Sequence, residues 1–149
     1  MPRVLVPPAS GLEDLEAVTI VDLLRRADIE VVTAGLHPGL VEGSRKTRVQ
    51  PDALIDELME QEFDMIALPG GIPGAENFKN DARIQSLLGR MARAGRYTAA
   101  ICAAPIALAQ AGLLDGKRVT SFPHFLDRQP IPGRRRPRAL TARPSLTML

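Results

Sequence analysis

The sequence is poor in several residue types and segment types, and each scarcity excludes a class of protein. Aromatic residues make up 3% of the chain and tryptophan is absent, so there are few platforms for stacking nucleic-acid bases. Cys102 is the only cysteine, which rules out an internal disulfide and fits a reducing compartment. The chain has no apolar run of bilayer length and does not start with a signal-peptide pattern. We therefore expect a cytoplasmic protein without a membrane partner.

Motifs that bind metals or nucleotides are also missing. The two histidines, His37 and His124, are far apart in sequence and join no cluster of metal ligands. Neither a P-loop nor a GxGxxG fingerprint occurs, so we predict no cofactor. The formal charge of +2 would be −3 without the five arginines from Arg134 onward. The basicity thus belongs to the end of the chain, and we predict no specific nucleic-acid partner.

The stretch that is richest in information is residues 97–108. Residues 98–101 form a short apolar run typical of a buried strand, and residues 103–111 are good helix formers with Pro105 in the first turn. Cys102 lies between them, on a sharp strand-to-helix turn of the nucleophile-elbow type. A helix N-terminus beside a thiol lowers its pKa. The alternative is a cysteine that is buried as a small hydrophobic residue.

Strand and helix patterns alternate along the chain. We predict strands over residues 3–7, 30–34, 64–68, 98–101 and 118–122, helices over residues 12–26, 53–62, 81–94 and 103–111, and a loop or hairpin over residues 37–48. This order predicts a doubly wound α/β domain with a mainly parallel sheet and helices on both faces. Ligands of such folds bind at the carboxyl ends of the strands. Loops over residues 9–16, 69–75 and around Cys102 should meet there.

The composition changes near residue 130. We assign residues 1–129 to the α/β domain and residues 130–149 to an Arg/Pro-rich tail without hydrophobic periodicity, which we expect to be poorly ordered. If the tail does not pack, one edge and one face of the sheet should be left bare.

Four short motifs occur together and in order: GLEDLE at residues 11–16, LPGG at 68–71, GAEN at 74–77 and AICAAP at 100–105. In these motifs the chain resembles the ThiJ/PfpI superfamily, in the branch of the parkinsonism-associated protein deglycase and its bacterial relatives. The resemblance covers roughly residues 3–126. It implies a flavodoxin-like fold similar to class I glutamine amidotransferase domains, and a C-terminally truncated one, because the strand, loop and long helix that end such proteins are not found here.

The resemblance also implies a site. Cys102 matches the reactive cysteine of the family, and Glu16 matches the carboxylic acid that hydrogen-bonds its thiolate. Gly71 and Ala103 match the backbone N–H donors of an oxyanion-type pocket, with Gly70 beside them. Such a thiolate adds to an aldehyde while the acid moves protons, so Cys102 and Glu16 are the expected catalytic residues.

Other implications concern the surroundings of the site. Arg45 matches an arginine near the cysteine that attracts anions, and relatives are usually homodimers with residues 15–26 at the interface. Ala103 stands where protease-like members have histidine, which argues against a Cys-His protease. Phe122 stands where a relative has histidine. His124 follows two residues later and is assigned no catalytic role.

Three functions follow as hypotheses. The first is cysteine-dependent detoxification of reactive carbonyls, of glyoxalase or protein/nucleotide deglycase type, acting on a small aldehyde or on a glycated protein or nucleotide. The second is a non-catalytic, redox-sensing, chaperone-like stress protein, because a thiolate is easily oxidised. The third is an inactive product, because the sequence after Gly133 resembles a truncation or a changed reading frame.

Overall fold

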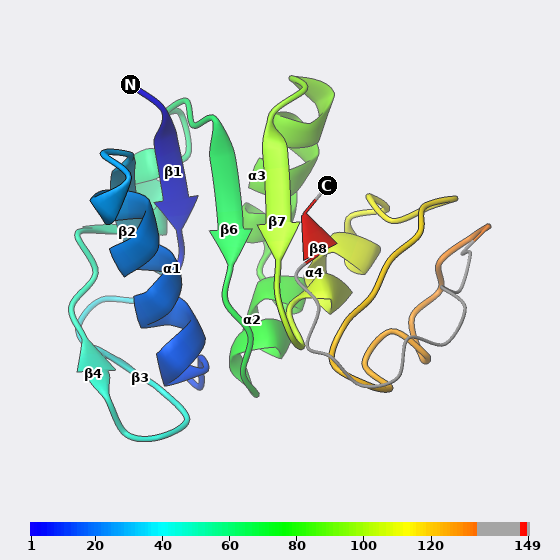
Figure 1. Ribbon diagram of the computed structural model, residues 1–149, viewed down its shortest axis with the longest axis horizontal. Helices are drawn as coiled ribbons and strands as arrows, with labels where there is room; N and C mark the ends of the chain where they lie inside the picture. The colour runs from blue at the N-terminus through cyan, green and yellow to red at the C-terminus, as the bar shows by residue number, and fades with distance from the viewer. Residues whose placement is uncertain (134–146, 149) are drawn as a thin grey trace.

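A six-stranded sheet runs through the protein in the order β5-β2-β1-β6-β7-β8 (Figure 1). The computed structural model describes residues 1–133 and 147–148. The strands are β1 (Arg3–Val6), β2 (Glu30–Gly35), β5 (Ala53–Leu54), β6 (Met65–Leu68), β7 (Tyr97–Ala100) and β8 (Thr147–Met148), and a separate hairpin joins β3 (Val41–Glu42) to β4 (Arg48–Val49). All pairs from β5 to β7 are parallel, and β8 is antiparallel to β7. The predicted doubly wound, mainly parallel sheet is confirmed.

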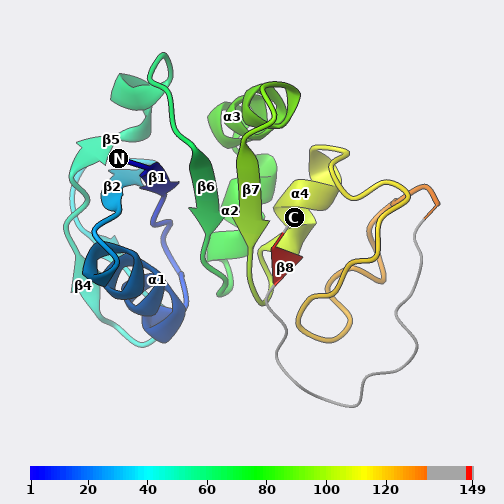
Figure 2. The ribbon, with the colours of Figure 1, turned by 45° about the horizontal axis from the view of Figure 1, so that its top comes forward.

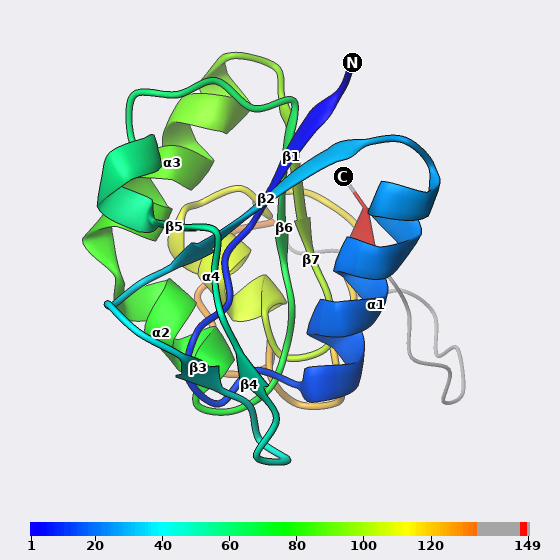
Figure 3. The ribbon, with the colours of Figure 1, turned by 90° about the vertical axis from the view of Figure 1, so that its left-hand side faces the viewer.

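Helices cover both faces of the sheet, as Figure 3 shows edge-on. One face carries α1 (Asp14–Arg26), and the other carries α2 (Gly74–Asn80), α3 (Ala82–Arg93), α4 (Pro105–Gln110) and the 3-10 helix η1 (Ile55–Leu58). Helix α1 has acids in its first turn and arginines in its last, which suits the helix dipole. The side chain of Asp81 caps α3 by accepting the N–H groups of Arg83 and Ile84.

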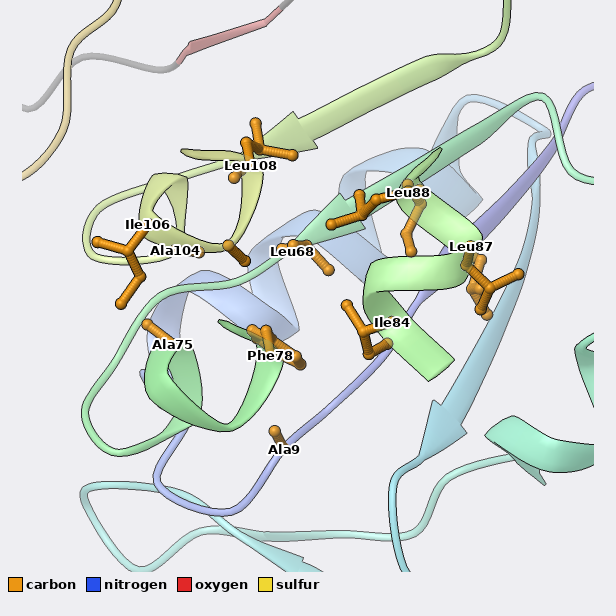
Figure 4. Close-up of a cluster of buried hydrophobic side chains, with 14 of the residues drawn as sticks. Ala9, Leu68, Ala75, Phe78, Ile84, Leu87, Leu88, Ala104, Ile106 and Leu108 are labelled. Carbon is orange, nitrogen blue, oxygen red and sulfur yellow. The ribbon is translucent and has the colours of Figure 1, made fainter. Parts of the chain in front are cut away.

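The main hydrophobic core lies between the sheet and the helices α2, α3 and α4 (Figure 4). Phe78, Leu88 and Leu108 are fully buried there and come from three different helices. Leu68 of β6 meets them from the sheet side. This packing holds the turns that follow β6 and β7, where the candidate site lies.

The opposite face has a smaller cluster. Val4, Val31 and Ala99 are among its buried members, and residues of α1 such as Val21 and Leu24 pack on it only half-buried. Figure 2 shows α1 lying on the β1–β2 side of this face.

Two predicted elements are wrong. Residues 53–62 do not form a helix, because Ala53 and Leu54 pair with the open edge of β2 and a 3-10 turn follows them. Residues 118–122 do not form a strand. The outer edge of β7 pairs with β8 instead, and the Phe122 N–H donates to the Cys102 carbonyl at 2.7 Å.

Helix α2 was not predicted, because Gly74 and Asn77 favour turns when local sequence alone is considered. It begins directly after the glycine-rich turn at residues 69–73, and it buries Ala75 and Phe78 against the core.

The predicted tail is described in part. Ile131 packs against the main core, and the Pro132 carbonyl accepts the Gly116 N–H at 2.9 Å. Residues 134–146 and 149 lie outside the described residues, and with them most of the expected poorly ordered segment. The expectation of a bare sheet edge is wrong at Ala99 and Ala100, because β8 pairs with them.

Candidate active site

Cys102 lies in a tight turn between β7 and α4, as the sequence predicts. Its φ of 59° is in the left-handed region, which turns the backbone sharply between the end of the strand and Pro105 at the helix start. The side chain is half-buried and the cysteine is free. The turn is at the carboxyl edge of the sheet, on the lower side of Figure 1, where α1 also begins.

Glu16 reaches this turn from the opposite face of the sheet. It lies in the first turn of α1, and its Oε2 accepts the backbone N–H of Gly70 at 2.8 Å. The carboxylate also hydrogen-bonds to the Cys102 thiol. A Cβ atom on Gly70 would lie 2.6 Å from Glu16 Oε2 and 2.7 Å from Cys102 Cβ. Only glycine therefore fits between the acid and the cysteine.

Two backbone N–H groups point at the sulfur. Gly71 and Ala103 both hydrogen-bond to Cys102, and these bonds lower the pKa of the thiol. Gly71 has a φ of 95°, and a Cβ there would lie 2.2 Å from the Glu13 nitrogen, so this donor too requires glycine. The structure thus brings together Cys102, Glu16 and the predicted N–H donors. Their arrangement suits an oxygen that gains negative charge next to the sulfur.

The pKa of the Cys102 thiol is raised, whereas its position before a helix leads one to expect a lowered pKa. Burial raises the pKa of Cys102, the charge and hydrogen bond of an ionised Glu16 raise it further, and the N–H groups of Ala103 and Gly71 offset only part of this rise. Helix α4 begins three residues later, so its dipole acts from a distance.

Arg45 does not join these groups. It is exposed at the turn of the β3–β4 hairpin, and within residues 1–133 and 147–148 its guanidinium has no hydrogen bond or ion pair. Its backbone N–H donates to Asp14 Oδ2 at 2.9 Å.

His124 is also outside the site. Its side chain is 90% exposed, and its Nδ1 contacts Asp127 Oδ2 at 3.1 Å.

Asp14 is a residue that sequence reasoning missed. Its buried carboxylate holds the hairpin turn, and hydrogen bonds from Thr47 and from the Arg45 N–H lower its pKa to about 2. An acid in the first turn of a helix is usually solvated, so the position of Asp14 in the sequence does not indicate that it is buried. The residue that could have indicated it is Gly43, because a Cβ there would come within 2.5 Å of either carboxylate oxygen.

Other ligand sites are not evident at the residues that the structure describes. No group of three or more His, Cys, Asp or Glu side chains among them is placed to hold a metal ion. None of the helices in the described part of the chain has both the length and the apolar composition needed to cross a bilayer. Two surface hollows of about 430 and 390 Å³ lie away from Cys102, the first by the ends of β1 and β2 and the second beside α1.

Comparison with known proteins gives a consistent family. The DJ-1/PfpI family matches residues 2–134. Protein DJ-1 homolog B of Arabidopsis thaliana is 43% identical over 82% of this chain, and a deglycase of Pyrococcus abyssi is 32% identical over 84%. The chain spans 28% of the plant relative's length and 75% of the archaeal one.

A solved structure is similar to this chain in both sequence and fold. The structure of oxidized Toxoplasma gondii DJ-1 is 41% identical and superposes with a TM-score of 0.84, over 87% of this chain and 72% of that one.

Proposed function

The chain belongs to the DJ-1/PfpI family, and we propose that it consumes small reactive aldehydes, as a glyoxalase or deglycase, through Cys102 and Glu16. The observation that carries this proposal is the contact of one thiol with one carboxylate and two backbone N–H groups at the carboxyl edge of the sheet. The name of the deglycase relative from Pyrococcus abyssi supports the same chemistry.

The first step forms a bond between sulfur and carbon. Cys102 Sγ adds to the aldehyde carbon while the proton of the thiol passes to Glu16. The aldehyde oxygen gains negative charge next to the N–H groups of Gly71 and Ala103. Glu16 then gives the proton to that oxygen, which yields a neutral hemithioacetal.

The second step moves hydrogen between neighbouring carbons. Glu16 removes the proton from the former aldehyde carbon and delivers it to the adjacent carbon, while the hydroxyl proton of the first carbon passes to the oxygen of the second. The first carbon thereby becomes a thioester and the second an alcohol. Water then cleaves the thioester, which releases an α-hydroxy acid and restores the thiol. The net reaction of methylglyoxal with one water gives lactate, so no external oxidant or reductant is needed.

The direct test is methylglyoxal consumption together with lactate formation. We expect Cys102→Ala to be inactive and Glu16→Gln to lose about 10²–10⁴-fold in rate, because the proton carrier is gone. Asp22→Asn is the matched control, since Asp22 is an exposed acid of the same helix that pairs with Arg26. Lactate formation by Cys102→Ala at the wild-type rate, or none by the wild type, contradicts the proposal.

A redox role is the second candidate, because the Toxoplasma gondii relative was solved as an oxidized protein. Peroxide should then add two oxygen atoms to Cys102, which intact mass measurement detects. If Cys102 stays a thiol in peroxide while methylglyoxal is consumed, the enzymatic function alone remains.

We further propose that the partner is a second copy of this chain, bound through α1. Leu15 and Val18 lie one turn apart on this helix and are 74% and 51% exposed. Val18 also lines the hollow of about 390 Å³. Sedimentation should show a dimer for the wild type and a monomer for Val18→Glu. A monomeric wild type contradicts this proposal.

A further inference from the structure

The first turn of α1 has few contacts of the usual kind to hold it. Asp14 and Ala17 are the only buried residues of this helix, and its N-cap residue Glu13 makes no side-chain cap hydrogen bond. Such a bond commonly stabilises the start of a helix. Glu16 lies in this uncapped turn, so the position of its carboxylate depends on what else holds the turn.

The β3–β4 hairpin holds the turn through the buried carboxylate of Asp14. Asp14 Oδ2 accepts the Arg45 N–H at 2.9 Å, and Asp14 Oδ1 accepts the Thr47 N–H at 3.0 Å. The two bonds use different oxygens, so they fix both the place and the rotation of the carboxylate. A Cβ on Gly43 would lie 2.5 Å from each oxygen, so the hairpin also encloses the carboxylate closely.

Two further contacts join the hairpin to the start of α1 (Figure 3). The Ser44 N–H donates to the Leu12 carbonyl at 2.8 Å. Leu12, Ala17 and Val41 form a small buried cluster of their own, in which the hairpin packs against the helix. Both buried residues of α1 are therefore in contact with the same hairpin.

The segment that the hairpin holds leads directly to the candidate site. The Glu13 N–H donates to the Gly70 carbonyl at 2.9 Å, and Glu16 Oε2 accepts the Gly70 N–H at 2.8 Å. The carboxylate of Glu16 also hydrogen-bonds to Cys102. An unbroken series of contacts thus runs from the hairpin turn to the thiol.

We propose that the β3–β4 hairpin holds Glu16 against Cys102, and that Asp14 is the positioning residue through which it does so. When the contact between Asp14 and the hairpin is lost, the first turn of α1 shifts and the acid moves away from the thiol. This inference deepens the proposed function and rests on the role of Glu16 as the proton carrier.

The first experiment measures how easily Cys102 ionises and needs no turnover. Iodoacetamide is neutral and alkylates the thiolate of Cys102, the only cysteine. The rate at about pH 6 is divided by the rate at about pH 10, so that differences in access to the sulfur cancel. An ionised Glu16 raises the pKa of this thiol, so loss of the contact should raise the ratio.

Gly43→Ala is the main variant, because it displaces the Asp14 carboxylate without changing any charge. We expect the ratio to rise about three-fold, and Glu16→Gln should raise it by a similar factor. Adding Gly43→Ala to Glu16→Gln should raise it no further, because the hairpin acts through Glu16. Gly89→Ala in α3 is the matched control and should leave the ratio unchanged, since its nearest neighbour is the mobile end of Arg93.

Asp14→Asn is the second variant, and it is informative even if Gly43→Ala does not fold. An amide has one acceptor oxygen, so it cannot accept both backbone N–H groups of the turn. We expect a similar rise in the ratio. Glu42→Gln is its control, because it removes a charge from the same hairpin without touching those N–H groups, and it should leave the ratio close to that of the wild type.

Turnover of methylglyoxal gives a second readout. Gly43→Ala should lower kcat by about ten-fold and leave KM within about two-fold, because the proton carrier is misplaced. A wild type without turnover contradicts the proposed function, and the alkylation ratio still tests the inference. An unchanged ratio in either folded variant, or a further rise when Gly43→Ala is added to Glu16→Gln, overturns it.

Discussion

The two faces of the sheet are built differently. The face covered by α2, α3 and α4 holds a large core in which residues such as Phe78 and Leu88 are completely buried. The face covered by α1 holds a small cluster, on which Ile20, Val21 and Leu24 stay half-buried. We therefore expect most of the burial free energy to come from the first face.

The candidate site draws one group from each face. The turn that carries Cys102 leads into α4 on the large core, whereas Glu16 comes from α1 on the small cluster. Gly70 lies between the two side chains and donates its N–H to Glu16. The contact between Glu16 and Cys102 therefore depends on how firmly α1 is held against its less deeply packed face of the sheet.

The largest effect should appear when the same substitution is made on each face. Leu88→Ala removes a fully buried side chain and should cost about 2–5 kcal/mol in the free energy of unfolding. Leu24→Ala removes a half-buried one and should cost clearly less, because part of its surface is already in water. Urea unfolding of both variants gives the comparison. Equal losses would show that the two faces contribute alike.

The second effect concerns the contact between Glu16 and Cys102, which come from the two different faces. Gly70→Ala places a methyl group against both Glu16 and Cys102 and should lower the rate of methylglyoxal consumption by about 10²-fold, because the two groups are pushed apart. The control is Gly89→Ala in α3, where the nearest atom is the mobile end of the Arg93 side chain. Wild-type turnover by Gly70→Ala would show that the acid and the thiol need not touch.

The smallest effect is a pH dependence on the α1 face. The pKa of Asp14 falls from 3.8 to about 2 in the fold, because of hydrogen bonds from Thr47 and Arg45. Its contribution to stability is complete above about pH 4 and is lost as the pH falls through about 2. Between these values the free energy of unfolding should fall more steeply for the wild type than for Asp14→Asn. Urea unfolding at several acidic pH values measures both slopes, and parallel slopes would contradict the assignment.

The sequence predicts those parts of the fold in which local pattern and tertiary role agree. The strands around Leu5, Ile66 and Ala99 are short apolar runs, and α1 and α3 have apolar residues at helical spacing, so all of them were found. The helix predicted over residues 53–62 is wrong because Ala53 and Leu54 pair with the open edge of β2. Local propensity does not indicate this pairing. Thr147 and Met148, in a segment expected to be unstructured, pair with β7.

The candidate site was predictable to a different extent. The turn position of Cys102 follows from the flanking patterns alone. The acid and the N–H donors came from the family resemblance, because Glu16 and Gly71 lie far from the cysteine in sequence. The raised pKa of the thiol depends on burial and on the distance to Glu16, and neither can be derived from spacing. Asp14 was missed because its partners at residues 44–47 become neighbours only in the fold.

The left-handed backbone at Cys102 also limits which amino acids can replace it in evolution. At a φ of 59°, asparagine and aspartate are accommodated most readily among side-chain-bearing residues, whereas a β-branched residue is strongly strained. Serine, which is not branched, keeps the turn and still presents an oxygen nucleophile. Threonine carries the same hydroxyl but would have to distort the turn. A lineage that exchanged the nucleophile of this site would therefore pass through serine or aspartate, and the route to threonine is closed by the backbone.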